Sequence, residues 1–217
     1  MPQTDSAHPA HNRRAKALEW WEAMSSDPNG SPGRVPAEEW LNVFALVTYI
    51  PAPLGEFLDK LRRELVPHDD PRAHVSLLPP RPLGGEWRQA WAEVRNTLQR
   101  RPAFEVELTG IRTFPVTDVI YLEVGAGAAE LCDIHAAMNS NSLAFEEPFA
   151  YHPHVTLAQD ISHQDVGDLL KLAERRWREF RGQRSFRAER AVFVQNTISD
   201  RWLDLAEYRL DGTPVNL

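Results

Sequence analysis

The strongest constraint on this chain is a four-residue pattern that occurs twice: a histidine, an apolar residue, a hydroxyl residue and a second apolar residue. The two tetrads are His74 to Leu77 (His-Val-Ser-Leu) and His154 to Leu157 (His-Val-Thr-Leu). Both are flanked by apolar or β-favouring residues, so both are predicted to be strands. Because side chains alternate along a strand, each histidine shares a face with its hydroxyl residue, and the apolar residues turn towards a core. Two such faces brought together would make a site with two imidazoles and two hydroxyl groups.

Two histidines and two hydroxyl groups suit the chemistry of a phosphodiester. The unperturbed pKa of histidine lies nearest neutrality, so one imidazole can take a proton from water while its charged partner gives one to the departing oxygen. Ser76 and Thr156 can donate hydrogen bonds to the phosphoryl oxygens as negative charge builds there. This scheme requires no metal and no other cofactor, and it leaves open which of His74 and His154 is the base.

The paired tetrads resemble the signature of the 2H phosphoesterase superfamily, which includes bacterial 2′-5′ RNA ligase-like cyclic phosphodiesterases. The run Leu77 to Pro82 (Leu-Leu-Pro-Pro-Arg-Pro) also resembles one bacterial branch of that family. The resemblance covers about residues 41 to 210. It implies a substrate with a 2′,3′-cyclic phosphate, opened to a 2′-phosphate, and in reverse the joining of ends by a 2′-5′ bond.

The expected elements recur in a fixed order, a strand, a helix and a tetrad strand in each half. The pattern alone predicts an α+β domain rich in antiparallel strands. The resemblance adds a bilobal, pseudo-twofold fold with two sheets lining a central cleft and helices outside. Pro79 and Pro80 are expected to end the first tetrad strand, and Ser162 to cap the last helix. The expected strands span residues 43–50, 73–78, 104–108, 119–124, 151–159, 186–195 and 201–210, and the expected helices span residues 56–66, 86–100, 128–138 and 164–180.

The first 40 residues lie outside the resemblance and are interpreted as an extension of a single domain that spans residues 41–217. Residues 1–12 are polar and expected to be disordered, whereas residues 13–24 can form a helix with two tryptophans. Residues 27–33 are rich in proline and glycine and predict a loop. The sequence leaves open the role of this extension and the oligomeric state.

Composition limits the classes of partner. The chain has 217 residues, of which 42% are hydrophobic and 25% charged, so it can form a sizeable core. Its net charge of −7 argues against an extended nucleic-acid footprint, but not against a small nucleotide or an RNA end as the substrate. The single cysteine, Cys132, excludes an intrachain disulfide and favours a cytoplasmic location. No signal sequence is expected, and the longest apolar run, residues 43–54, is too short to span a membrane.

Four further features have two interpretations each. Tyr151 could stack on a nucleobase or pack at the start of its strand. Arg81 could bind phosphate or be a solvated loop residue. His152 shares a strand face with His154, so the two could ligate a metal, although the tetrads explain a site without one. The arginine-rich stretch over residues 171–190 could guide RNA, but its interleaved glutamates favour a solvated helix face.

The leading hypothesis is a metal-independent cyclic phosphodiesterase. Its predicted catalytic residues are His74 and His154, with Ser76, Thr156 and Arg81 at the phosphate and Tyr151 at the base. One alternative is a phosphodiesterase of 2′-5′-linked or cyclic signalling nucleotides. A second is a non-catalytic module that binds nucleotides or RNA ends, against which the two intact histidines speak. A third is a metal-dependent hydrolase.

Overall fold

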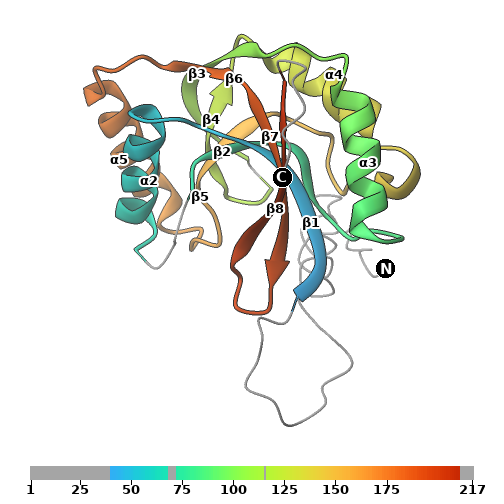
Figure 1. Ribbon diagram of the computed structural model, residues 1–217. Helices are drawn as coiled ribbons and strands as arrows, with labels where there is room; N and C mark the ends of the chain where they lie inside the picture. The colour runs from blue at the N-terminus through green and yellow to red at the C-terminus, as the bar shows by residue number, and fades with distance from the viewer. Residues whose placement is uncertain (1–39, 68–71, 115, 211–217) are drawn as a thin grey trace, which may run out of the picture.

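The computed structural model describes residues 40–67, 72–114 and 116–210, which form two antiparallel four-stranded sheets with helices outside them (Figure 1). One sheet has the order β2-β1-β7-β8 and the other the order β5-β4-β3-β6. Their strands are β1 (Trp40–Tyr49), β2 (His74–Arg81), β3 (Phe104–Thr113), β4 (Ile120–Val124), β5 (His154–Ala158), β6 (Ser185–Ala188), β7 (Arg190–Thr197) and β8 (Trp202–Arg209).

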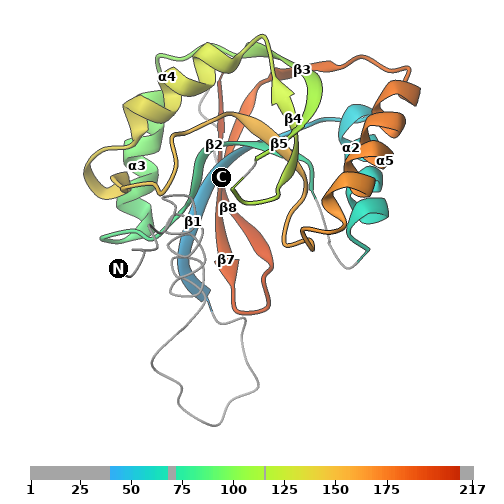
Figure 2. The ribbon, with the colours of Figure 1, turned by 180° about the vertical axis from the view of Figure 1, so that it is seen from behind.

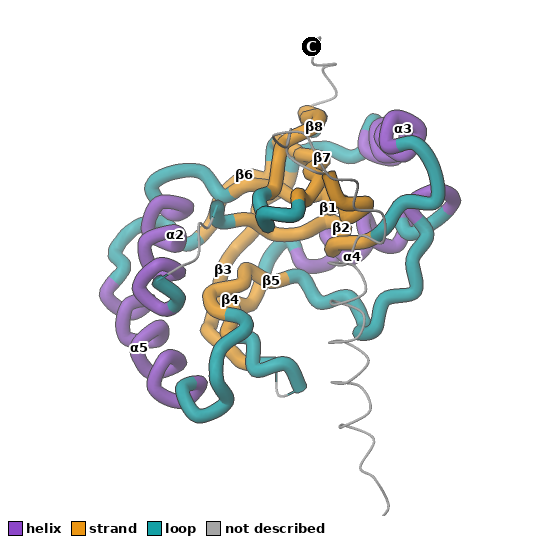
Figure 3. Tube along the Cα trace, turned by 90° about the horizontal axis from the view of Figure 1, so that it is seen from below, coloured by secondary structure: helices purple, strands orange, loops and turns teal. Residues whose placement is uncertain are grey.

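The helices lie in two pairs on opposite sides of the strands. Helix α2 (Leu54–Leu65) packs with α5 (Val166–Glu179), and α3 (Trp87–Leu98) packs with α4 (Ala128–Met138) (Figure 2). Seen from below, the strands occupy the space between the two pairs (Figure 3). A short 3-10 helix, η1 (Asn141–Leu143), follows α4. The expected α+β class, with two antiparallel sheets and outer helices, is therefore confirmed.

The alternation of each tetrad strand determines what it buries. Val75 and Leu77 on β2, and Val155 and Leu157 on β5, are all 0% exposed and belong to one continuous core. Each such burial is worth about 1.5–3 kcal/mol relative to an exposed side chain. Helix α2 contributes a stripe of leucines to the same core, because its buried positions recur at helical spacing. The residues between the buried ones, which include both tetrad histidines, are left on the opposite strand face.

The expected end of the first tetrad strand is wrong. Strand β2 continues through Pro79 and Pro80 to Arg81 and pairs with β1 as far as Phe44. This is allowed because β2 is the edge strand of its sheet, where a missing N–H donor breaks no ladder on the outer side. The register along this part of the pair is interrupted by shifts between Phe44 and Val47.

Two other expectations are corrected near the C-terminal half. The single strand expected over residues 186–195 is two strands, β6 and β7, which belong to different sheets and are separated only by Glu189. Helix α5 begins at Val166 with Asp165 before it, so Ser162 does not cap it. The hydroxyl of Ser162 instead accepts a hydrogen bond from the Gln164 N–H, at 3.4 Å, in the preceding turn. The last two strands, β7 and β8, pair with each other in antiparallel orientation.

The expectations for the extension, namely disorder over residues 1–12, a helix over 13–24 and a loop over 27–33, lie outside the described residues. Among the helices of the described part, none combines the length and apolar character that crossing a bilayer requires.

Candidate active site

The two tetrad strands lie next to each other. Strands β2 and β5 are edge strands of their respective sheets and contact each other. His74 and Ser76 share one face of β2, and His154 and Thr156 share one face of β5, with all four side chains partly exposed. The two imidazoles are close enough that charge on His154 lowers the pKa of His74. The structure therefore brings together the four tetrad residues that the sequence singled out.

Both imidazoles are held by the same local contact. Nδ1 of His74 lies 2.7 Å from the carbonyl oxygen of Arg72, and Nδ1 of His154 lies 2.7 Å from the carbonyl oxygen of His152. A carbonyl oxygen can only accept, so Nδ1 must carry the proton in each ring. The remaining nitrogen, Nε2, is thereby left to accept a proton in the neutral ring or to donate one in the charged ring.

The protein environment favours the neutral form of both histidines. Burial lowers the pKa of His74 to about 4, and the positive charges of Arg62, His154 and Arg72 act in the same direction. Burial also lowers the pKa of His154, with a smaller contribution from His152. The hydrogen bonds to backbone carbonyls oppose these effects without cancelling them. A phosphate between the two rings would reverse the balance, because a nearby anion stabilises an imidazolium.

Three residues that the sequence did not indicate surround His74. Tyr49 pairs with His74 across the β1–β2 ladder. The guanidinium of Arg72 lies over the Tyr49 ring, 3.3 Å from the ring centroid. The Tyr49 hydroxyl donates to Asp204 Oδ1 at 2.6 Å, and Arg72 Nη1 donates to Asp204 Oδ2 at 2.8 Å. Asp204 is separated from Tyr49 by 155 positions, so no local sequence signal connects them. Only the position of Arg72, two residues before the histidine, could have suggested it.

The surroundings of His154 are aromatic instead. Phe114 and Tyr121 stack with their centroids 4.0 Å apart, and both meet the His154 ring edge-on at 5.1 and 5.4 Å. His152 makes similar edge contacts with both rings at 5.5 Å. Neither Phe114 nor Tyr121 was predicted, because they come from β4 and the segment before it rather than from the tetrad strand.

The structure favours the packing interpretation of Tyr151. Its hydroxyl donates to the backbone carbonyl of Ser76 at 2.6 Å, and so links the residues before β5 to β2. Its ring stacks on His135 with centroids 4.0 Å apart and an angle of 1° between the planes. Burial raises the pKa of the Tyr151 hydroxyl, which keeps it a donor. Both the ring and the hydroxyl are engaged within the protein, so we withdraw Tyr151 as a base-stacking residue.

The predicted role of Arg81 is also wrong, because its side chain is engaged within the protein. Its side chain is 1% exposed and forms an ion pair with Glu147, which also accepts a hydrogen bond from His135 Nε2 at 2.8 Å. Its other donors bind the carbonyl of Pro79 and two acceptors of the segment after α4, Asn139 Oδ1 and the Leu143 carbonyl, each at 3.0 Å. A guanidinium committed in this way is neither a solvated loop group nor a phosphate ligand. The sequence offered both interpretations, and the structure supports neither.

The metal alternative finds no third ligand in the described part of the chain. His152 and His154 do lie on one face, with ring centroids 6.4 Å apart. Across the described residues, however, no three or more histidine, cysteine, aspartate and glutamate side chains are grouped as metal ligands would be.

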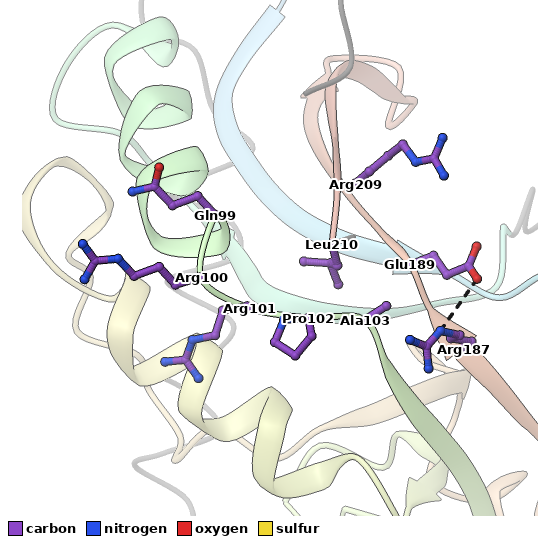
Figure 4. A pocket seen from close by; sticks show the side chains of 9 residues that line it. All are labelled: Gln99, Arg100, Arg101, Pro102, Ala103, Arg187, Glu189, Arg209 and Leu210. Carbon is purple, nitrogen blue, oxygen red and sulfur yellow. Dashed lines mark ion pairs between the residues drawn. The ribbon is translucent and has the colours of Figure 1, made fainter. Parts of the chain in front are cut away.

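A second arginine-rich surface lies away from the tetrads, around a hollow of about 410 Å³ between the α3–β3 connection and the ends of β6 and β8. Figure 4 shows that Arg100 and Arg101 point to one side of this hollow, whereas Arg209 points to the other. Arg187 pairs with Glu189 at 3.9 Å. Because the guanidinium groups diverge, they do not form the convergent set of donors that a phosphate group requires. Within the arginine-rich stretch over residues 171–190, Arg176 is paired with Glu64 and Glu179.

Two curated proteins are similar in sequence to parts of this chain. A 112-residue stretch is 33% identical to an RNA 2′,3′-cyclic phosphodiesterase of Aeropyrum pernix and covers 48% of this chain and 62% of that protein. Another curated relative, from Oceanobacillus iheyensis, is 29% identical over 79 residues, which cover 36% of this chain and 46% of that protein. The chain thus spans less than two thirds of the length of these two relatives.

Solved structures share the fold. E. coli LigT in its apo form superposes with a TM-score of 0.52 at 16% identity, covering 80% of this chain and 98% of LigT. Usb1 of Kluyveromyces marxianus gives a TM-score of 0.50 at 15% identity, covering 78% and 99% of the two chains. Further LigT structures contain 3′-AMP, ATP or NADP+.

The family assignment rests on a longer match than any of these relatives gives. The sequence pattern of the 2′-5′ RNA ligase superfamily matches residues 50–197, more than half of the chain and a range that contains both tetrads. Together with the two antiparallel sheets and the adjoining tetrad strands, this match shows that the chain belongs to the 2′-5′ RNA ligase (2H phosphoesterase) superfamily.

Proposed function

We propose that this protein is a metal-independent phosphodiesterase that opens 2′,3′-cyclic phosphates, on RNA ends or small nucleotides, to 2′-phosphates. The observation that carries the proposal is the equivalent anchoring of two neighbouring imidazoles, each through Nδ1 to a carbonyl oxygen at 2.7 Å. Each ring then has Nε2 left for proton transfer and a hydroxyl residue two positions away on the same strand face. The similarity to an RNA 2′,3′-cyclic phosphodiesterase supports the choice of substrate.

In the proposed reaction, the neutral histidine takes a proton from water as the water oxygen attacks phosphorus. The bond between phosphorus and the 3′-oxygen breaks, and the protonated histidine gives its proton to that oxygen. Ser76 and Thr156 donate hydrogen bonds to the non-bridging oxygens, where negative charge increases in the transition state. In the described part of the chain, neither hydroxyl has a competing hydrogen-bond partner. If a 5′-hydroxyl replaces water, the same proton transfers join two ends through a 2′-5′ bond.

The first test is hydrolysis of 2′,3′-cyclic AMP, and of an RNA that ends in a 2′,3′-cyclic phosphate, with and without EDTA. We expect turnover to a 2′-phosphate that EDTA leaves unchanged within about twofold, because two imidazoles can supply both proton transfers. Activity that EDTA abolishes and Zn²⁺ restores would instead support His152 and His154 as metal ligands. Binding of these nucleotides without turnover would support a non-catalytic module.

The low pKa values of the two tetrad histidines predict that kcat/KM is highest at acidic pH. The productive form needs one neutral and one protonated imidazole, and both groups have pKa values below 6.5 in the free protein. We therefore expect kcat/KM to fall about tenfold for each pH unit above neutrality, as the acid loses its proton. On the acidic side, kcat/KM should fall as pH approaches about 4, where His74 also becomes protonated.

The pH dependence of kcat should be displaced to higher pH than that of kcat/KM. It reports the enzyme–substrate complex, in which the anionic phosphate stabilises the imidazolium. Circular dichroism across the same pH range separates this titration from unfolding. A kcat/KM optimum at about pH 8 or above would contradict the proposed protonation states.

A further inference from the structure

The two halves of the site differ at one equivalent position. Two residues before each tetrad histidine stands the residue whose carbonyl anchors that imidazole, Arg72 for His74 and His152 for His154. Because side chains alternate along extended backbone, each of these residues has its side chain on the same face as its histidine. One half therefore presents a cation beside the phosphate-handling residues, whereas the other presents an imidazole among aromatic rings.

Two contacts hold the guanidinium of Arg72 in place, and a third fixes the carboxylate that it binds. It lies over the Tyr49 ring at 3.3 Å, donates to Asp204 Oδ2 at 2.8 Å, and is further fixed because the Tyr49 hydroxyl binds the other oxygen of the same carboxylate. Its side chain nevertheless stays 61% exposed. Among the described residues, Arg72 donates to Asp204 through Nη1 alone, and a guanidinium offers five N–H donors in a planar fork. The group can therefore hold the carboxylate and an incoming anion together.

The charge around His74 favours such an anion. Arg62, which is buried on α2, and Arg72 both lower the pKa of His74 through their positive charges. The same electrostatic potential attracts a substrate that carries more negative charge than one cyclic phosphate. This local field exists in a chain whose net charge is −7, so it is a property of the site rather than of the whole surface.

We propose that Arg72 forms a second phosphate subsite, which binds the phosphate on the 5′-oxygen of the nucleoside whose cyclic phosphate is opened. Tyr49 and Asp204 are its positioning residues. This inference rests on the proposed function and adds a substrate preference to it: the protein favours cyclic phosphates that carry a second phosphate over the cyclic mononucleotide. The second phosphate is either a terminal 5′-phosphate or the internucleotide phosphate of an RNA end.

The test uses three substrates that differ only on the 5′ side: 2′,3′-cyclic AMP, the same nucleotide with a 5′-phosphate, and the dinucleotide ApA with a 2′,3′-cyclic phosphate end. We expect the wild type to prefer the second and third substrates in kcat/KM by about tenfold or more, since a charge-assisted hydrogen bond has that effect. In Arg72→Met the preference should drop below about threefold, and in Arg72→Lys it should be intermediate. The preference of the wild type should decrease as salt is raised.

Arg112→Met is the matched control. Arg112 is 62% exposed, pairs with Glu123 at 3.7 Å, and shares the strand face of Tyr121 on the other sheet. Its replacement should leave the ratio between substrates within about twofold of wild type. Comparing ratios removes any general effect of Arg72 on the placement of His74, because all three substrates depend on that histidine.

The outcomes separate this inference from the proposed function. Turnover of 2′,3′-cyclic AMP with no preference for a second phosphate would overturn the subsite and leave the phosphodiesterase proposal standing. An equal loss on all three substrates in Arg72→Met would reduce Arg72 to a positioning residue of His74 and also overturn the subsite. Loss of the preference in Arg112→Met alone would place the second phosphate on the other sheet. A preference for the dinucleotide but not for the 5′-phosphorylated nucleotide would show recognition of the upstream nucleoside instead.

Discussion

Replacing either tetrad histidine, as His74→Ala or His154→Ala, is expected to lower kcat/KM for a 2′,3′-cyclic phosphate by about 10²- to 10⁴-fold. Each substitution removes one of the two proton transfers, and a positioned acid or base group contributes that range of rate. The loss corresponds to about 3–5 kcal/mol of transition-state stabilisation. Because the proposed reaction needs both histidines in opposite protonation states, the double variant should be little worse than the less active single variant. Steady-state hydrolysis of 2′,3′-cyclic AMP measures both effects.

His163→Ala is the control for a general effect of removing a histidine. The side chain of His163 is 79% exposed and pairs with Asp118 in the loops before β4 and α5, outside the tetrad strands. Its replacement should change kcat/KM by less than about twofold. Thermal unfolding of all variants shows whether a loss of turnover reflects the site rather than the fold. A fall of less than tenfold in both tetrad variants, with intact folding, would refute two-histidine catalysis.

Arg81→Met is expected to lower the free energy of unfolding by about 3–5 kcal/mol. Removing one partner of a buried ion pair leaves the other charge without compensation, which costs that amount in proteins. Here the carboxylate of Glu147, which is 12% exposed, would keep His135 as its hydrogen-bond donor among the described residues. The carbonyls of Pro79 and Leu143 and the amide of Asn139 would also lose their shared donor. Urea or guanidinium denaturation measures the change.

Arg190→Met is the matched control for Arg81. Arg190 pairs with Glu207 at 3.1 Å, but the arginine side chain is 58% exposed, so its loss should cost less than about 1 kcal/mol. At a temperature where Arg81→Met remains folded, its kcat/KM should stay within about tenfold of wild type. If instead Arg81→Met kept its stability and lost activity by a hundredfold, the phosphate role that the sequence first offered would be restored.

The local parts of this structure could be predicted from the sequence. The helix expected over residues 128–138 has those bounds as α4, and it starts after Gly127, whose φ of 88° requires glycine. Which side chains of a tetrad point to the core follows from the alternation along the strand, so the four residues themselves determine it. The β6–β7 boundary could not be read in this way. No glycine or proline separates the two strands in the sequence, and the division is seen in the pairing of β6 with β3 and of β7 with β1.

Side-chain contacts around the two tetrad strands join positions that are distant in the sequence. Arg81 meets Glu147 across 66 positions, and Tyr49 meets Asp204 across 155. Nothing near Arg81 in the sequence shows that its strand continues past two prolines and carries it into the interior. An arginine shortly after a tetrad therefore suggested a phosphate ligand, whereas the topology places it against a carboxylate from the segment before β5.

The contacts from Ser76 through Tyr151, His135 and Glu147 to Arg81 begin and end on β2, so they form a closed ring of interactions. Tyr151 stands three residues before His154, and the ring therefore fixes the starting point of β5 against β2. The fold consequently sets the distance between the two imidazoles before any ligand binds. In the proposed reaction, substrate binding would then need little rearrangement, because folding already orients the proton donor against the acceptor.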